Sequence, residues 1–287
     1  MIKHLCRYLE NEGLDIHAAE VIRNGSVIFH HCPDEDKRYP VYSVTKSLTS
    51  AAFSLACDDG LLTPETPLSD HLDTDIKMNE AFKAMPFSRF LTMTAGEYPF
   101  RPEGDDWLRF ILSLDKDYSD TAYHYSNIPA YLVGRAVENA VGGDLMSYLD
   151  KRIFSPLAIE APAYKTCPQG HFYGATGMEL SVHELALLGL LYLNKGRFGG
   201  VSLISESSVS QALTPRVLTP AGDSYGYFFR IAEDHFSMVG KWGQRCMVYP
   251  GSGLVIAYLS DVRERPDALY ELMKRFAADI ISGRILQ

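Results

Sequence analysis

The chain lacks the features of several large protein classes. Its 27 lysines and arginines are outnumbered by 36 acidic residues, and the net charge of −9 argues against binding to nucleic acid or to an anionic membrane. No apolar stretch is long enough to span a bilayer. The N-terminal segment MIKHLCRYLENEGLDIH carries charges throughout and lacks the apolar core of a signal peptide. These absences predict a cytoplasmic protein.

Metal and cofactor motifs are also missing. The cysteines are odd in number, widely spaced and without a C-x-x-C pair, so we expect reduced, buried side chains at Cys6, Cys32, Cys57, Cys167 and Cys246. There is no G-x-S-x-G, H-E-x-x-H, Walker or G-x-G-x-x-G motif. Neighbouring His30 and His31 would point to opposite faces of a strand, which disfavours a metal hydrolase. The sequence therefore indicates no metal and no organic cofactor.

Strand patterns are concentrated at the two ends of the chain. Residues 18–32 form two short strand patterns around Asn24-Gly25, a pair that favours a type I′ hairpin turn. Three further strand candidates are residues 225–234, 235–250 and 253–261. Apolar residues at helical spacing predict a helix at the N-terminus and another after Pro266.

The middle of the chain is mostly helical. Residues 44–60 are almost wholly apolar or small and predict a buried helix, and Ser181 and Glu184 fit the capping box of a later one. Because both ends must meet to complete one sheet, we expect an α+β fold with an antiparallel sheet flanked by helices. The expected sheet part comprises residues 1–56 and 162–287, and the mainly helical insertion residues 57–161.

Ser43-Val44-Thr45-Lys46 is an S-x-x-K tetrad at the start of the buried helix. Positions i and i+3 share a helix face, so the Lys46 amine can reach the Ser43 hydroxyl. A serine hydroxyl needs a base, and burial favours the neutral lysine that can act as one. A second copy, Ser113 to Lys116, lies in a charged stretch with no reason to be buried. For that copy an N-capping serine and a solvated lysine are explanation enough.

A second candidate element is the triplet Tyr125-Ser126-Asn127. A tyrosine hydroxyl near a lysine can relay protons, and an asparagine amide can orient both lysine and substrate. Since other tyrosines surround Tyr125, a simple aromatic cluster remains an equal alternative. The similar triplet from Tyr192 to Asn194 ends an amphipathic helix, where a core tyrosine and a C-cap suffice.

Taken in order, these motifs resemble the serine β-lactamase superfamily, in particular its class C, D,D-peptidase and esterase-like branch. The resemblance covers roughly residues 20–260 and includes VIRNGSVIFHH, YSVTKSLTSAAFSLACDDGLLTPETPLSDHL, FLTMTAGEY and YHYSNIPAYLVGRAVENAVG. It implies a β-lactamase/transpeptidase-like fold in which Ser43, Lys46 and Tyr125 are catalytic and Asn127 binds substrate. Ser43 would form an acyl-enzyme, with the oxyanion held by its own N–H and one from the strand near Ser237 or Met238.

The third family motif is altered. His235-Phe236-Ser237 stands where β-lactam-binding members usually have Lys-Thr-Gly, and histidine there resembles the esterase-like members. The resemblance makes His235, Ser237 and Met238 candidate substrate-binding residues, although a solvated strand-end histidine is an equal alternative. Lys241 or Arg245 could replace the lost charge, depending on the register of the strand, but surface charges are the preferred interpretation of both.

The sequence therefore predicts a β-lactamase-related serine hydrolase of a small-molecule ester or amide, rather than an efficient β-lactamase. Action on cell-wall peptide would require export, for which no signal is present. The intact Ser43, Lys46 and Tyr125 favour catalysis. The altered third motif leaves an alternative, a non-hydrolytic covalent-binding or degenerate penicillin-binding-like module.

Overall fold

The fold is built on one large antiparallel sheet. The computed structural model describes residues 2–34, 37–73 and 75–285. Eight strands follow the order β2-β1-β12-β11-β10-β9-β8-β7, so the first strands of the chain pair with the last, as predicted. The strands are β1 (Ala18–Arg23), β2 (Ser26–His31), β7 (Val217–Leu218), β8 (Ser224–Tyr225), β9 (Arg230–Ile231), β10 (Phe236–Val239), β11 (Arg245–Tyr249) and β12 (Leu254–Leu259).

The turn between β1 and β2 has the predicted geometry. Asn24 and Gly25 have φ angles of 50° and 80°, the two positive values that a type I′ turn requires. Asparagine tolerates this region better than most residues and glycine enters it freely. The hairpin predicted from Asn24-Gly25 is therefore confirmed.

Two of the three predicted C-terminal strands are each interrupted. Residues 225–234 form β8 and β9, with Phe228 at φ 60° between them, and residues 235–250 form β10 and β11 joined by the turn Lys241–Gly243. Trp242 has φ 63° in that turn. The prediction of uninterrupted strands there is wrong, because residues with positive φ end the strand pairing. The apolar content of these segments does not reveal those φ values. The third candidate, β12, is confirmed.

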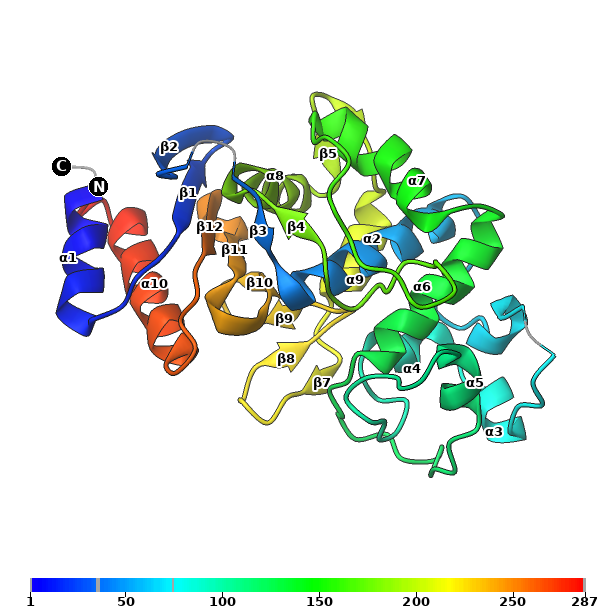
Figure 1. Cartoon of the computed structure of the whole chain (residues 1–287). Coiled ribbons are helices and arrows are strands. Elements are labelled where there is room, and N and C mark those ends of the chain that lie inside the picture. The colour runs from blue at the N-terminus through cyan, green and yellow to red at the C-terminus, as the bar shows by residue number, and fades with distance from the viewer. Residues whose placement is uncertain (1, 35–36, 74, 286–287) are drawn as a thin grey trace.

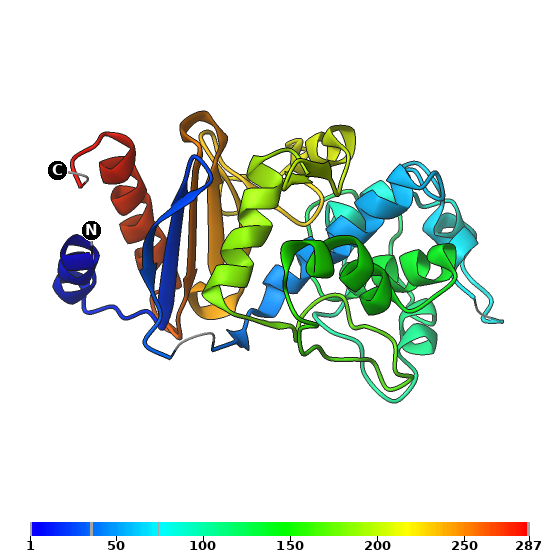
Figure 2. The same cartoon turned by 90° about the horizontal axis from the view of Figure 1, so that it is seen from above.

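Helices cover both faces of the sheet. The terminal helices α1 (Ile2–Glu12) and α10 (Pro266–Ile281) pack together on one face, and α8 (Val182–Leu193) lies on the other (Figure 1, Figure 2). The predicted capping box is present, since Ser181 Oγ accepts from Glu184 N–H and the Glu184 carboxylate accepts from Ser181 N–H. The two apolar layers on either side of the sheet form separate cores.

The remaining helices lie beyond α8 and pack around α2 (Thr45–Asp58), in which twelve of fourteen residues are buried. This burial follows from the apolar and small side chains of the segment. The other helices are α3 (Glu80–Lys83), α4 (Phe87–Leu91), α5 (Trp107–Leu112), α6 (Ile128–Val141), α7 (Leu145–Leu149) and α9 (Glu206–Leu213). Short strand pairs are β3 (Tyr39–Pro40) with β4 (Glu179–Leu180), and β5 (Arg197–Phe198) with β6 (Val201–Ser202).

The helix α2 begins beside the sheet and runs into the helical part, so its first turn lies where the two parts meet (Figure 2). The division at residues 57 and 161 stays a prediction. Across the described ranges, no helix is long and apolar enough to cross a membrane.

Candidate active site

Ser43 lies in a sharp turn directly before α2. It is the middle residue of a short 3-10 segment, Tyr42–Val44, and is partly exposed. Tyr42 has φ 48°, a left-handed conformation that is strained for a tyrosine. Thr45 fastens the turn, because its hydroxyl donates to Tyr42 O at 2.7 Å and accepts from Met178 N–H at 3.3 Å. The strained turn places the Ser43 hydroxyl at the first turn of the buried helix.

Lys46 is buried directly behind this hydroxyl. Its Nζ lies 3.1 Å from Ser43 Oγ, as the i, i+3 spacing predicts, and the side chain is 1 % exposed. The amine also contacts Asn127 Oδ1 at 2.7 Å and Ala175 O at 2.9 Å. Burial lowers the pKa of Lys46, and Tyr125 opposes part of that shift. The site thus favours a neutral amine within hydrogen-bonding distance of a serine hydroxyl.

Asn127 connects this amine to the opposite wall. Its Oδ1 accepts from Lys46, and its Nδ2 donates to the Tyr173 hydroxyl at 3.2 Å. The backbone is also fixed, since Asn127 N–H donates to Phe100 O at 2.9 Å and Ser126 Oγ donates to Pro99 O at 2.6 Å. Asn127 is buried and sets the position of the Lys46 amine.

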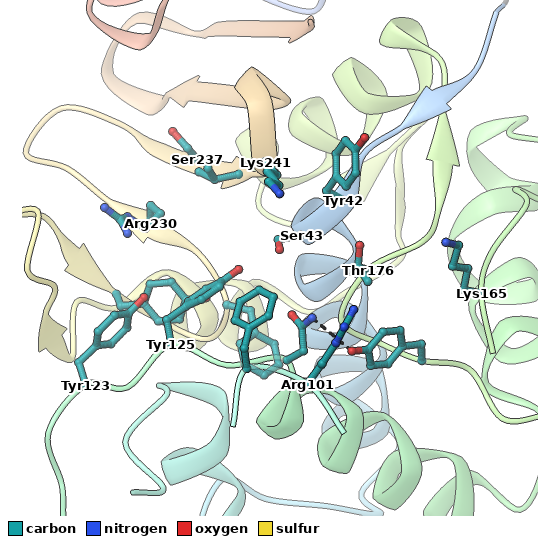
Figure 3. A pocket seen from close by; sticks show the side chains of 17 residues that line it. Tyr42, Ser43, Arg101, Tyr123, Tyr125, Lys165, Thr176, Arg230, Ser237 and Lys241 are labelled. Atoms are coloured by element: carbon teal, nitrogen blue, oxygen red, sulfur yellow. Dashed lines mark hydrogen bonds between the residues drawn. The ribbon is translucent and has the colours of Figure 1, made fainter. Parts of the chain in front are cut away.

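Tyr125 lies at the entrance to this buried pair. Its ring centroid is 4.9 Å from Lys46 Nζ, and 39 % of the residue is exposed. In Figure 3 its hydroxyl points toward Ser43. The structure therefore brings together Ser43, Lys46, Tyr125 and Asn127, from two segments 79 or more residues apart.

Ser43, Tyr125 and Asn127 line a cavity of about 610 Å³ between the sheet and the helical part, and Lys46 is buried behind them. The cavity is rich in aromatic rings. Its lining residues are Tyr42, Ser43, Phe100, Arg101, Tyr123, Tyr125, Asn127, Lys165, Tyr173, Thr176, Tyr225, Phe228, Arg230, Ser237, Val239, Gly240 and Lys241 (Figure 3). A small aromatic-lined cavity with a few polar groups is suited to a small molecule.

The strand β10 forms the sheet wall and closely approaches the turn that contains Ser43. A Cβ on Gly240 would lie 2.2 Å from Val41 O, so no larger residue fits there without moving the backbone. The local sequence Met-Val-Gly-Lys therefore places a glycine at the point where the wall touches the segment before Ser43.

The backbone of β10 shows which N–H groups can face a substrate. Gly240 N–H donates to Gln244 O at 2.7 Å, so the polar groups of Gly240 and Met238 face β11 and those of Ser237 and Val239 face the other way. Ser237 is the last β10 residue paired with β9, opposite Arg230. The N–H of Val239 is therefore directed past the end of β9, away from β11.

The structure does not bring His235 or the side chain of Met238 to the cavity. His235 is 4 % exposed, its ring stacks on Tyr249 with centroids 4.7 Å apart, and its Nε2 lies 2.9 Å from the Tyr270 hydroxyl of α10. Burial lowers the pKa of His235. It is thus neither a substrate ligand by position nor a solvated histidine, because it faces the core beneath α10. Met238 is fully buried in the core on the α8 side.

The two candidate replacement cations lie on different sides. Lys241 lines the cavity, with its Nζ 4.3 Å from the centre of the Trp242 ring. Arg245 instead places its guanidinium 3.6 Å over the ring of Tyr270, on the face covered by α10. The register left open by the sequence is thereby resolved in favour of Lys241 as the cation in the cavity.

The two look-alike motifs lie outside the cavity. Ser113 ends α5, and Lys116 donates to Ala95 O at 2.7 Å with its Nζ 3.2 Å from the centre of the Tyr98 ring. Lys116 is thus half-buried, contrary to the expectation of a solvated lysine. Tyr192 is buried and Asn194 is the C-cap of α8, as predicted.

Sequence reasoning missed several cavity residues. Tyr173 and Ala175 hold Asn127 and Lys46, and their segment, Tyr-Gly-Ala-Thr-Gly, is recognisable only by its two glycines at positive φ. Arg230 and Tyr123 were also missed, because nothing in their neighbourhoods matches a motif. Within the described residues, no group of three or more His, Cys, Asp or Glu side chains could hold a metal ion.

Comparison with known proteins gives a family and a fold. The model of the beta-lactamase family matches residues 13–279. A candidate 6-aminohexanoate-dimer hydrolase from Bacillus anthracis has a TM-score of 0.79 at 19 % identity, over 98 % of this chain and 82 % of that one. A candidate beta-lactamase from Bacteroides dorei has a TM-score of 0.80 at 17 % identity, over 96 % and 97 %.

A third structure is the penicillin-binding protein from Bacillus halodurans, with a TM-score of 0.73 at 18 % identity over 96 % of this chain and 99 % of that one. At such low identities, the TM-scores of these three structures show a shared fold. No curated protein matches the sequence.

Proposed function

The chain belongs to the beta-lactamase family, and on this premise we propose that it cleaves a small ester or amide through an acyl-enzyme on Ser43. Members of this family are generally serine hydrolases. The observation that carries the proposal is the buried Lys46 amine, 3.1 Å from the Oγ of Ser43, which lines a cavity of about 610 Å³.

In the first step, the neutral Lys46 amine takes the Ser43 proton as the serine oxygen bonds to the substrate carbonyl carbon. The carbonyl π electrons move to its oxygen, and two backbone N–H groups stabilise that oxyanion. Ser43 supplies one of these groups. For the other we propose Val239 rather than Met238, because the polar groups of Met238 face β11 and those of Val239 face away from it.

Collapse of the tetrahedral intermediate breaks the bond to the leaving group, which must receive a proton. Tyr125 lies between the Lys46 amine and the open cavity, so its hydroxyl can pass the Lys46 proton outward. Water then attacks the carbonyl carbon of the acyl-enzyme, and the site accepts a proton from that water. The bond from Ser43 Oγ to the acyl group breaks, and the site returns a proton to Ser43. The scheme uses only the side chains and backbone N–H groups of the site, together with water.

We propose ester or amide hydrolysis in preference to efficient β-lactam hydrolysis. The strand wall presents Ser237, Val239 and Gly240 to the cavity, and the lysine of the usual third motif is absent from it. The Bacillus anthracis structure, named for the hydrolysis of an aminohexanoate dimer, is consistent with amide cleavage on this fold. The choice of a small molecule over cell-wall peptide rests on the cytoplasmic location, which stays a prediction.

The test compares wild type, Ser43→Ala and a matched control, Ser113→Ala, which alters the look-alike tetrad. Each protein is incubated with p-nitrophenyl acetate, p-nitrophenyl butyrate and nitrocefin, and a fluorophosphonate adduct is measured by intact mass. We expect ester turnover and one adduct in wild type and in the control, with both lost in Ser43→Ala by at least about 10³-fold. Nitrocefin turnover should be weak.

An adduct on Ser43 without turnover would support a covalent-binding module in place of a hydrolase. Unchanged activity or labelling in Ser43→Ala, with the protein folded, would contradict the assignment of the nucleophile.

A further inference from the structure

The cavity differs in charge from the rest of the chain. The protein carries a net charge of −9, yet among the described residues that line the cavity there are four cations and no carboxylate. The cations are Arg101, Lys165, Arg230 and Lys241. A cleft lined by one sign of charge concentrates ligands of the opposite sign. The lining therefore favours an anionic substrate.

Arg230 is the cation that the structure holds most firmly. Its Nε donates to Asp223 Oδ2 at 2.5 Å, and its side chain is 27 % exposed. Asp223 is itself held by the hydroxyl of Thr219 and by the backbone of the turn before β8. With Nε directed at Asp223, the guanidinium plane is fixed and its Nη groups form the end of the side chain. A guanidinium fork held in this way is suited to a planar carboxylate.

Tyr123 adds a donor that is not in use. Its hydroxyl is buried and has no hydrogen-bond partner in the structure. Arg230 lies near enough to oppose part of the effect of burial on the pKa of Tyr123, but the two form no bond of acceptable geometry. Burial has the larger effect and raises that pKa, so the hydroxyl keeps its proton at neutral pH. A buried hydroxyl without a hydrogen-bond partner is destabilising unless a ligand supplies that partner.

These groups lie at one end of the cavity. In Figure 3 Arg230 and Tyr123 are on the side of Tyr125, and Lys165 is on the far side of Ser43. Ser237 lies opposite Arg230 in the register of β9 and β10, so both side chains project from the same face of the sheet. A ligand at Arg230 would therefore extend along the cavity from the nucleophile.

We propose that Arg230 and Tyr123 bind a carboxylate of the substrate, so that the hydrolase acts on a small ester or amide carrying a negative charge away from the cleaved bond. This proposal rests on the proposed function, because the position of the negative charge is defined relative to Ser43 as the nucleophile. Arg230 would give two parallel N–H donors and Tyr123 one O–H donor. Lys241, nearer to Ser43, would add to the attraction without fixing the geometry.

The test compares a neutral ester with anionic ones. The neutral probe is p-nitrophenyl butyrate, and the anionic probes are the p-nitrophenyl monoesters of glutaric and adipic acid, with charge in the acyl part, and 3-(butyryloxy)benzoate, with charge in the leaving group. We expect wild type to prefer at least one anionic probe by about 10-fold or more in kcat/KM, mainly through a lower KM.

Tyr123→Phe is the sharpest variant, because it removes a hydroxyl that has no partner in the free protein. Its Tm should equal or exceed that of wild type, while kcat/KM for the preferred anionic probe falls about 10-fold more than that for the neutral ester. Arg230→Gln should abolish the preference. Arg245→Gln makes the same change of charge outside the cavity, where the guanidinium lies over the Tyr270 ring, and should alter neither probe.

Equal rates on neutral and anionic probes, or equal losses on both in Tyr123→Phe and Arg230→Gln, would overturn the proposal. Binding of glutarate to Ser43→Ala, read as a Tm shift, separates this question from catalysis. If no ester is hydrolysed but glutarate stabilises Ser43→Ala and not its Arg230→Gln double variant, the carboxylate site stands and the proposed hydrolysis fails. If no ester is hydrolysed and glutarate has no effect, both fail.

Discussion

The substitution Asn127→Asp tests whether the Lys46 amine is the base. Asn127 Oδ1 lies 2.7 Å from Lys46 Nζ, and both groups are buried. The substitution keeps the shape and the accepting oxygen but adds a negative charge at that distance. On the other side the Tyr173 hydroxyl, 3.2 Å from Nδ2, can reverse its bond and donate to the new carboxylate. The fold should therefore tolerate the change.

The electrostatic effect is large and its sign is clear. At an effective dielectric constant of about 20, unit charges at this separation attract by about 6 kcal/mol. Even a third of that, about 2 kcal/mol, would reduce the neutral fraction of the amine about 30-fold at any pH well below its pKa. Burial lowers the pKa of Lys46 in the wild type, and the introduced carboxylate acts in the opposite direction. The neutral amine that the proposed mechanism requires should then appear only at higher pH.

The measurement is kcat/KM for p-nitrophenyl butyrate against pH in both proteins. We expect Asn127→Asp to be at least about 30-fold slower near neutral pH and to recover as the pH rises, because the rate follows the neutral amine. The matched control is Asn194→Asp, the same change at the exposed C-cap of α8, which should leave the profile unchanged. An Asn127→Asp profile that overlays the wild type would refute Lys46 as the proton acceptor.

Three further outcomes are expected. Gly240→Ala should lower kcat/KM at least about 10-fold and destabilise the protein by about 1–3 kcal/mol, because the added Cβ would meet Val41 O. The control is Gly251→Ala, whose Cβ would have nothing within 4 Å, and it should change neither kcat/KM nor Tm. His235→Ala should lower Tm but leave ester turnover unchanged, because His235 bonds to Tyr270 beneath α10; lost turnover in a folded variant would contradict this. Burial lowers the pKa of Lys116 from 10.5 to about 7, so between these values the unfolded chain binds a proton that the folded chain lacks. Stability from this residue should thus rise with pH across that window, and Lys116→Met should flatten the dependence of Tm on pH; an unchanged slope would argue against the lowered pKa.

The fold was largely predictable because its signals are local. The Asn24-Gly25 turn, the capping box at Ser181 and the apolar helix after Ser43 each depend on a few adjacent residues. Pairing of the two chain ends followed from the need to complete one sheet. The breaks at Phe228 and Trp242 were not predicted, because aromatic residues favour strands and only the backbone shows their positive φ.

The candidate site was predictable only in part. Ser43 and Lys46 are neighbours on one helix, so spacing alone places them together. His235 and Met238 were selected by counting along a strand, and one step in that count exchanges the faces. Arg230 and Tyr123 come together only through tertiary structure, so no pattern along the chain could join them.

The position of β1 has a consequence for synthesis. This strand lies between β2 and β12, so one of its edges stays unpaired until residues 254–259 have been made. Through most of translation, the growing chain therefore exposes an apolar strand edge, and the helix α2 lacks the sheet wall that faces its first turn. We expect polypeptides released early to be inactive and prone to aggregation, and ribosome-bound chains to depend on holding chaperones until the last hairpin emerges.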